Sequence, residues 1–297
     1  MLVPVSIRRY ASLISQQSDA VSSTVDLPTL ALTKPRWVVL LPNMRYFIEL
    51  SYRGTAYHGW QAQANGVSIQ TTIEAALTQR FGQPMYILGS GRTDAGVHAE
   101  QQFAHLDAAE PLPLSDTLIY SLNCILPDDI AIRSIFPVRP TDHARFSATS
   151  RYYQYHITRH KNVFQSGLTY HFRPELDDAL MNEACQRLLQ TTDFKSFSKA
   201  RADVTHFRCR LDMARWGRIG DRLTFHIRAN RFLWGMVRTI VGTMVEIGQG
   251  RMSLDQFETI IRAEDRAVAG RAAPANGLYL MEVTYPAEVL AGRVLFD

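Results

Sequence analysis

The residues with the clearest chemical potential lie in one glycine-rich stretch, residues 89–99, which reads GSGRTDAGVHA. Glycine permits backbone conformations with positive φ and lets another molecule approach closely, and the small residues Thr93 and Ala95 leave Asp94 accessible between them. An aspartate in such a loop can simply close the turn through its own backbone. If it faces a cleft instead, its carboxylate can act as a nucleophile or as a general base.

Three better-known motifs do not fit this stretch. In a dinucleotide-binding fingerprint the third glycine would fall at Asp94, whose charge would repel a pyrophosphate. In a phosphate-binding loop that starts at Gly91, Val97 and His98 stand where Lys and Ser or Thr are required. The His-x-Glu sequence at residues 98–100 would need a downstream Pro-Cys-x-x-Cys to bind zinc as base deaminases do. The cysteines are instead three isolated residues, Cys124, Cys185 and Cys209.

Residues 91–99 closely resemble the catalytic loop of the TruA-type tRNA pseudouridine synthases. Further segments resemble the same family in the same order along the chain. They are residues 52–54 (YRG), 59–61 (GWQ), 143–148 (HARFSA), 151–153 (RYY), 232–233 (FL), 236–238 (MVR), 241–242 (VG) and 277–280 (GLYL). An ordered set of matches from about Met44 to Pro286 is far more specific than any one of them.

The resemblance implies an enzyme, an isomerase that converts uridine to pseudouridine in the anticodon stem-loop of tRNA at positions 38, 39 and 40. It also implies homodimers that hold the anticodon arm, a cytoplasmic location, and no metal or other cofactor. The reaction breaks an N-glycosidic bond and rejoins base and sugar through carbon, so it needs no oxidant or group donor. Asp94 can serve as nucleophile or as base on a flipped nucleotide, and the residues do not choose between these roles.

Three further residues are expected to complete the site. Arg238 matches the family arginine that pairs with the catalytic acid, and it stands in an apolar segment where an unpaired guanidinium would be costly. An ionised Asp94 in a cleft that RNA closes needs such a cation beside it. Tyr153 matches the family tyrosine whose ring can stack on the extruded base and whose hydroxyl can relay a proton. The resemblance assigns Arg92 to displacing or holding the flipped nucleotide, and a simple phosphate contact is the alternative.

Periodicity and turn residues divide the chain into three parts. Residues 1–43 do not match the family; their arginines and serines faintly suggest a targeting peptide, but a mis-assigned start or a loose extension is the simpler interpretation. Residues 44–140 and 141–297 each show their own pattern of strands and helices. We expect an α+β fold of two ferredoxin-like, RRM-like halves whose sheets adjoin into one platform with a central catalytic cleft, the pseudouridine synthase fold.

Two expected elements would position the catalytic pair. A strand at residues 85–88 would lead into the loop of Asp94, and a helix from residue 231 to about 247 would carry Arg238 among apolar residues at helical spacing. The other expected strands are residues 45–52, 101–106, 130–136, 152–158, 208–215, 223–229 and 278–284. Three other helices are expected after Ser68, Ser115 and Ser253, which can cap them, and one more is expected over roughly residues 177–189.

Composition sets weaker bounds on function. The net charge of +4 and a pI near 9.0 are compatible with a polyanionic partner but too small to establish one. Short apolar runs argue against a membrane-spanning protein, and three scattered cysteines suit a reducing compartment. Basic residues concentrate in two windows that either contact phosphate or form a solvated surface. These are Arg201, Arg208, Arg210, Arg215 and Arg218, and Arg145, Arg151, Arg159 and Lys161 with His143, His156 and His160.

A catalytically silent RNA-binding protein on the same platform is the alternative. It would explain the basic windows and the aromatic residues equally well. It would not explain an acid at the centre of the most specialised loop, because the charge of Asp94 repels phosphate and weakens RNA binding. The sequence therefore favours the enzyme.

Overall fold

The chain forms one mixed β-sheet with accompanying helices, which makes it an α+β protein. The computed structural model describes residues 44–64, 66–199 and 205–294. The strands are β1 (Met44–Tyr52), β2 (Leu88–Gly89), β3 (His98–Ala108), β4 (Ile130–Val138), β5 (Ser150–Thr158), β6 (Tyr170–His171), β7 (Leu211–Ile219), β8 (Arg222–Ala229) and β9 (Leu278–Thr284). The helices are α1 (Ile69–Phe81), α2 (Asp116–Ile125), α3 (Asp178–Leu189), α4 (Met236–Gly248) and α5 (Leu254–Ala263).

Side-chain caps set the start of four helices. The hydroxyl of Ser68 accepts a hydrogen bond from the Thr71 N–H, and the Thr71 side chain returns a bond to the Ser68 backbone, which closes a capping box at the start of α1. Ser115 and Ser253 cap α2 and α5 in the same way from the side chain, and Asp177 caps α3. The helix starts predicted at the three serines are therefore confirmed.

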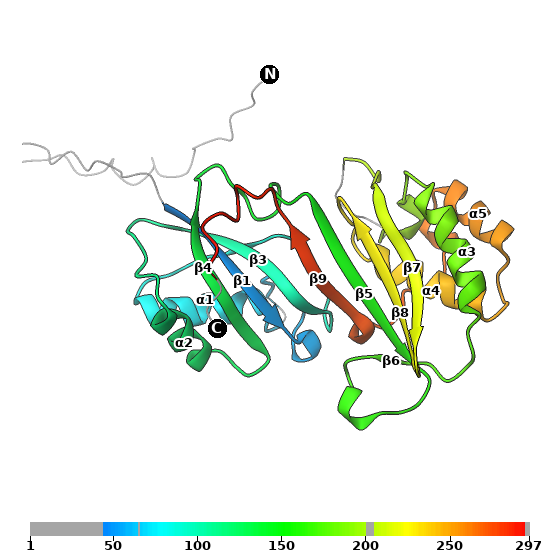
Figure 1. The fold of residues 1–297 in the computed structure, drawn as a ribbon, viewed down its shortest axis with the longest axis horizontal. Helices are drawn as coiled ribbons and strands as arrows, with labels where there is room; N and C mark the ends of the chain where they lie inside the picture. Colours follow the sequence, from blue (N-terminus) through cyan, green and yellow to red (C-terminus); the bar gives the residue numbers. More distant parts are fainter. Residues whose placement is uncertain (1–43, 65, 200–204, 295–297) are drawn as a thin grey trace, which may run out of the picture. The chain divides into compact units, whose positions relative to one another are not determined.

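The strands follow one order twice across the sheet. The full order is β4-β1-β3-β9-β5-β8-β7, with β2 paired to β3 and β6 paired to β5 (Figure 1). Among β1 to β4 the order is fourth, first, third, second. The longer strands β5, β7, β8 and β9 lie in the order β9-β5-β8-β7. Counted along the chain within this set, that order is again fourth, first, third, second. The second set of strands thus repeats the arrangement of the first without a visible sequence repeat.

The last strand, β9, joins the two sets at the middle of the sheet. It lies between β3 and β5 (Figure 1), parallel to β3 through the pairs His98–Tyr279 and Ala99–Leu280. On its other edge β9 runs antiparallel to β5, where Leu280 is opposite Tyr153. The start of β3, which follows residues 90–97, is therefore separated from Tyr153 of β5 by a single strand, β9.

Two apolar clusters support the sheet. One contains Phe47, Phe103 and Phe136 with the apolar residues of α1 and α2, and the other contains Phe225 with the apolar residues of α3, α4 and α5. After β9 the chain returns to the first cluster, in which Tyr285 and other residues of the final segment are buried. Both ends of the described chain are thus anchored on the side of β1 to β4.

One strand is shorter than expected. The strand predicted at residues 85–88 is reduced to β2, Leu88–Gly89. The N–H groups of Met85 and Ile87 donate to side-chain oxygens of α1, at 3.2 and 3.0 Å, instead of to a neighbouring strand. The helix side chains therefore satisfy the backbone that sheet pairing would otherwise use.

The helix that carries Arg238 starts later than expected. It was predicted from residue 231, but α4 begins at Met236. Gly235 has φ of 73°, a left-handed conformation through which a right-handed helix cannot run. Arg238 consequently lies in the first turn of α4, and residues 231–235 form the turn that precedes it.

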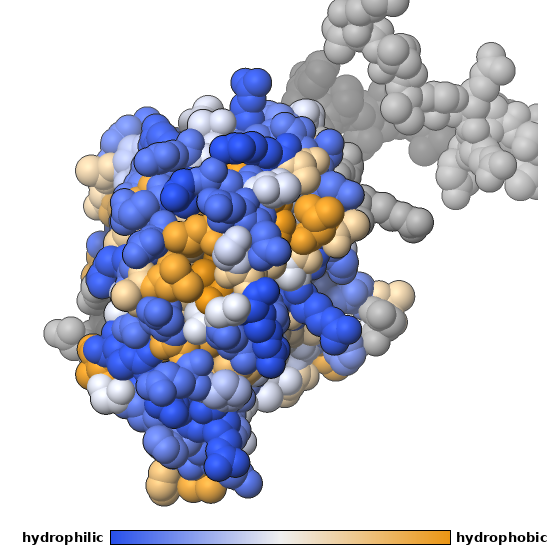
Figure 2. Space-filling view, turned by 90° about the vertical axis from the view of Figure 1, so that its right-hand side faces the viewer, coloured by the Kyte–Doolittle hydropathy of each residue, from blue (hydrophilic) through white to orange (hydrophobic). Residues whose placement is uncertain are grey.

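The end of the sheet that carries β7, α3 and α5 is mostly polar at its surface, with an apolar group in its middle (Figure 2). Partly buried apolar residues of these helices include Leu180, Leu189, Leu254 and Ile261.

Among the described residues, no helix combines the length and the hydrophobicity that crossing a membrane would require.

Removal of the Arg293 side chain is expected to lower the free energy of unfolding by about 3 kcal/mol, because it strips the cation from a buried carboxylate. Glu49 of β1 is only 1% exposed. Its oxygens accept bonds from Arg293 Nε at 2.5 Å and Nη2 at 2.6 Å, and from Gln101 Nε2 at 2.8 Å. Urea denaturation of Arg293→Ala measures the loss. Arg262→Ala, which breaks an exposed pair with Glu258, is the matched control and should change little; equal effects of the two variants would contradict the prediction.

Stability is also expected to fall as the pH is lowered from about 7 to 5. Burial, with a smaller contribution from nearby arginines, lowers the pKa of His105 and His156 from 6.5 to about 4. In the unfolded chain these histidines bind a proton below about pH 6.5, whereas in the folded chain they bind one only below about pH 4. Lowering the pH between these two values therefore favours the unfolded state. His105 Nδ1 also accepts the Ala144 N–H at 3.2 Å, a bond that protonation would break.

The expected loss is about 2 kcal/mol or less per histidine between pH 7 and pH 5. Urea midpoints at the two pH values measure it. Three aspartates also have lowered pKa values, namely Asp107, Asp142 and Asp178. Their contribution to stability is lost only in more acidic solution, below the ordinary pKa of an aspartate. In His105→Gln the dependence should be weaker, and a slope equal to that of the unaltered protein would show that this histidine is not responsible.

Candidate active site

The loop of residues 90–97 is fastened to β1, β3 and the segment before α1. Ser90 N donates to Phe103 O at 2.7 Å, and Trp60 N donates to Thr93 O at 3.1 Å. The Thr93 hydroxyl is buried and shares a hydrogen bond of 2.8 Å with the Tyr52 hydroxyl. These bonds hold the residue before Asp94 and do not involve the Asp94 side chain.

Two glycines have a steric or conformational role around this loop. Gly96 has φ of 79°, which turns the chain from the loop into β3. Gly59 has φ of 90°, and a Cβ atom there would lie 2.6 Å from Thr93 O. The segment before α1 can therefore pack against the loop only with glycine at residue 59.

The other two glycines of the motif do not have the conformational role expected of them. Among the described residues, those with positive φ do not include Gly89 or Gly91. A Cβ atom at Gly89 would lie 2.5 Å from the ring of Trp60, so this glycine is required by packing. At Gly91 a Cβ atom would meet nothing within 4 Å.

The structure brings Asp94 and Arg238 together. Arg238 Nη1 donates to Asp94 Oδ2 at 2.7 Å, and the two side chains are 22% and 24% exposed respectively. Arg238 Nε donates to Ala273 O at 2.7 Å, which fixes the orientation of the guanidinium. The ion pair joins the loop before β3 to the first turn of α4, two segments 144 residues apart.

A second donor to Asp94 was not found from the sequence. Trp234 Nε1 donates to Asp94 Oδ1 at 2.8 Å, so both carboxylate oxygens are bound. The Lys199 ammonium lies 3.8 Å from the centroid of the Trp234 ring. Helical spacing could not have revealed this contact, because α4 begins at Met236 and Trp234 lies in the turn before it.

Tyr153 lies on β5 at the centre of the sheet. Its ring meets Phe232 edge to face, with centroids 5.0 Å apart and planes at 85°. Burial raises the pKa of Tyr153 to about 12, and the negative charge of Asp94 contributes to the rise while Arg151 opposes it. The hydroxyl is therefore protonated at neutral pH, as a proton donor to substrate would have to be.

Arg92 lies two residues before the acid on the exposed surface of the loop. Its guanidinium takes part in no hydrogen bond or ion pair with the rest of the described chain. The structure therefore presents it to solvent, and does not bring it into the cluster of Asp94, Arg238 and Trp234.

Arg151, one of the residues in the basic windows, has a structural position instead. Its Nη1 donates to the carbonyl oxygens of Ala148 and Asn230 at 3.1 and 3.0 Å. Its Nη2 donates to Ser90 O at 3.2 Å and to Arg145 O at 2.7 Å. Burial lowers its pKa. One guanidinium thus ties the start of the Asp94 loop to two other segments near the site.

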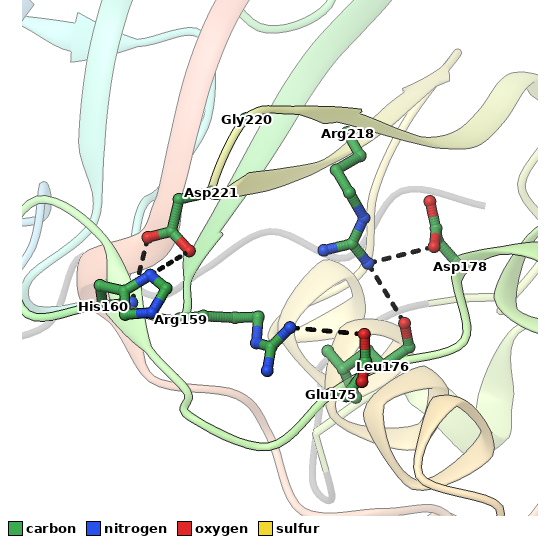
Figure 3. A pocket seen from close by; sticks show the side chains of 8 residues that line it. All are labelled: Arg159, His160, Glu175, Leu176, Asp178, Arg218, Gly220 and Asp221. Carbon is green, nitrogen blue, oxygen red and sulfur yellow. Dashed lines mark hydrogen bonds and ion pairs between the residues drawn. The ribbon is translucent and has the colours of Figure 1, made fainter.

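A separate depression lies far from Asp94 in the chain and contains other members of the basic windows (Figure 3). Here each basic residue faces an acid. Arg218 Nη2 lies 3.1 Å from Asp178 Oδ1, Arg159 Nη1 lies 3.4 Å from Glu175 Oε1, and His160 Nδ1 lies 2.8 Å from Asp221 Oδ1. Within each pair the acid offsets the charge of the basic residue, so the depression carries no excess of positive charge with which to attract phosphate.

Other members of the windows differ in accessibility. Arg208 and Arg215 are exposed, and Arg210 lies 3.1 Å from Asp212. Arg201 lies outside the described residues. Within the described ranges, no group of three or more His, Cys, Asp or Glu residues is arranged to hold a metal ion.

Comparisons with known proteins agree on one family. A family model described as tRNA pseudouridine synthase matches residues 184–286. A protein of Parabacteroides distasonis named tRNA pseudouridine synthase A is 48% identical over 245 residues, which are 82% of this chain and 97% of the relative. Proteins of the same name from Porphyromonas gingivalis and Bacillus pumilus are 45% and 38% identical over 248 and 246 residues, again 82% of this chain, and 98% and 99% of the relatives.

Proposed function

Because the chain belongs to the tRNA pseudouridine synthase A family, we propose that it isomerises uridine to pseudouridine in the anticodon stem-loop of tRNA, at positions 38, 39 and 40. The observation that carries the proposal is the Asp94–Arg238 ion pair of 2.7 Å, on a glycine-rich loop at the middle of the sheet. It offers a carboxylate that is paired with a cation and is partly open to a ligand.

The chemistry requires little more than such a group. The N1–C1′ bond of uridine breaks and a C5–C1′ bond forms, the C5 proton passes to solvent, and N1 gains a proton. Mass and oxidation state do not change. Asp94 either adds to the nucleotide or removes a sugar proton, and in both roles its charged form acts on a nucleotide that has left the base stack.

Two neighbours have supporting roles in the proposal. Tyr153 stacks on the extruded base or donates a proton through its hydroxyl, for which its raised pKa and its place beside Asp94 are suitable. Arg92, exposed beside Asp94, contacts the RNA and displaces or holds the flipped nucleotide. Trp234 and Arg238 hold the carboxylate from the other side of the site.

The repeated strand order supports two ferredoxin-like halves. We propose a division near residue 140, with residues 44–140 and 141–297 as the halves and with the segment after β9 returning to the first of them. The site then lies where the halves adjoin. By family resemblance we further propose a cytoplasmic homodimer that cradles the anticodon arm of tRNA and uses no cofactor.

Tritium release tests the function and its location in tRNA. Unmodified tRNA transcripts labelled at uridine C5 should lose tritium to water when the enzyme is added, because C5 becomes the glycosidic carbon. A transcript with cytidine at positions 38, 39 and 40 should release none. Binding without release from any transcript would favour the catalytically silent RNA-binding protein, and release from the cytidine transcript would place the target elsewhere.

Arg92→Ala is expected to weaken tRNA binding. Loss of one phosphate contact should reduce the slope of log affinity against log salt by about 0.7 to 0.9. Filter binding at several salt concentrations measures it. Arg80→Ala removes an exposed arginine of α1 and is the control. If Arg92→Ala binds tRNA with unchanged affinity and slope, Arg92 does not touch the RNA.

A further inference from the structure

We propose that Trp234 is a positioning residue for Asp94: its indole N–H and the Arg238 guanidinium together set the orientation of the reactive carboxylate. The inference rests on the proposed function, because it has catalytic meaning only if Asp94 reacts. Trp234 lies in the turn before α4, 140 residues from Asp94 in the sequence. It belongs to none of the motifs that support the proposed function.

Two donors restrict the carboxylate more than one. The terminal torsion of an aspartate side chain is broad, so a single bond from Arg238 to Oδ2 leaves rotation about the Cβ–Cγ bond largely free. A second bond from Trp234 Nε1 to Oδ1, at 2.8 Å, fixes the carboxylate plane. An ionised carboxylate accepts about four hydrogen bonds, so lone pairs are left for substrate on the exposed side. The geometry orients the acid without blocking it.

The indole is itself held in place. Lys199 N donates to Trp234 O at 2.8 Å, and the Lys199 ammonium lies 3.8 Å from the ring centroid, where a cation is attracted to the ring face. On the following residue, Gly235 has φ of 73° and ends the turn before the helix. Backbone and cation thus fix the direction in which the N–H points.

Burial in the core does not explain why a tryptophan stands at residue 234. Trp234 is 52% exposed, whereas Trp60 and Trp216 are 2% and 5% exposed. An aromatic side chain that is half open to water contributes little to the core, and the polar end of this one is committed to Asp94. Substitution should therefore affect the site much more than the fold, which makes the proposal testable.

Trp234→Phe keeps an aromatic ring and removes the donor. We expect kcat to fall about ten- to a hundredfold, the effect of losing a hydrogen bond to a charged group, while KM for tRNA and the melting temperature stay near their original values. The control Tyr120→Phe removes the hydroxyl group from an exposed aromatic residue of α2 and should leave kcat unchanged. Equal kcat for Trp234→Phe and the unaltered enzyme would overturn the proposal, as would a rise in KM with kcat intact.

Fluorescence gives a readout that does not depend on turnover. The emission of Trp234 is the difference between the spectra of the unaltered enzyme and Trp234→Phe. In the Asp94→Ala background this difference spectrum should shift, because the indole N–H loses its acceptor, whereas Asp107→Ala should leave it unchanged. An unshifted spectrum in Asp94→Ala would show that the bond is absent in solution.

Different results would contradict the positioning role of Trp234 and the proposed function. If Asp94→Asn is inactive but Trp234→Phe has full kcat, the positioning role is wrong and the proposed function stands. If Asp94→Asn retains activity, the proposed function is wrong, and with it any catalytic meaning of the Trp234 contact.

Discussion

Asp94→Asn is expected to abolish turnover on tRNA while tRNA binding and the fold persist. Asparagine has the shape of aspartate, but it carries no charge and is neither a nucleophile nor a base at neutral pH. Loss of the side chain proposed to react with the nucleotide should lower kcat on the order of 10⁴-fold or more. Single-turnover tritium release with excess enzyme measures the rate, and filter binding measures the affinity for tRNA.

Asp107→Asn is the matched control for this variant. Asp107 also pairs with an arginine, Arg45, at 2.7 Å, but near the start of β1 and the end of β3, away from the loop that precedes β3. Its substitution removes the same charge and the same kind of ion pair, and turnover should survive. A rate for Asp94→Asn within a few-fold of that for Asp107→Asn would show that the loop aspartate is not the reacting group.

Arg238→Met should reduce turnover about a hundredfold or more, because the carboxylate loses the cation that pairs with it and holds it in place. The fold should also lose stability, by about 2 kcal/mol, since the pair is three-quarters buried but not fully enclosed. Methionine fills similar volume, but it cannot replace the bond from Arg238 Nε to Ala273 O. Kinetic assays and urea denaturation of the same preparation separate the two effects.

A double-mutant cycle decides whether the two residues act as a pair. Asp94→Asn combined with Arg238→Met should be less destabilised than the sum of the single variants, by about 0.5 to 3 kcal/mol. Arg45→Met, whose side chain is 18% exposed, disrupts an ion pair of similar burial elsewhere and should destabilise the fold without affecting kcat. Strictly additive stabilities, together with a near-normal rate for Arg238→Met, would contradict the pairing.

The parts of this molecule that were predictable from sequence are those with local signals. Serine caps at residues 68, 115 and 253 act within one helical turn, so their pattern in the sequence is sufficient. The contact between Asp94 and Arg238 spans 144 residues, and in the sequence only the family resemblance links the two residues. An arginine among apolar residues needs a partner, as Arg238 does, but its surroundings in the sequence do not name that partner.

The contacts that were missed depend on backbone conformation and on distant carbonyl groups. Trp234 reaches Asp94 because Gly235 turns the chain before α4, and the left-handed conformation of that glycine is not visible in the pattern of apolar residues. Arg151 belongs to a window predicted either to contact phosphate or to form a solvated surface, whereas it binds four backbone oxygens near the site. A count of basic residues cannot distinguish a free guanidinium from one that is already satisfied.

The same limit applies to the basic windows. Arg218 and Arg159 pair with Asp178 and Glu175, acids that lie 40 and 16 residues away in the sequence. Charge density in a sequence window ignores such partners, because they come from other elements. Arg92 shows the opposite case: it belongs to no basic cluster, yet it is exposed beside the candidate site.

Nucleoside analysis of tRNA tests the central claim most directly, namely that Asp94 of this chain makes pseudouridine. An unmodified tRNA transcript is incubated with the unaltered enzyme or with Asp94→Asn, digested to nucleosides, and separated by liquid chromatography. We predict a pseudouridine peak, with an equal loss of uridine, for the unaltered enzyme and no such peak for Asp94→Asn. The absence of pseudouridine with the unaltered enzyme, or equal amounts with both proteins, would contradict the account.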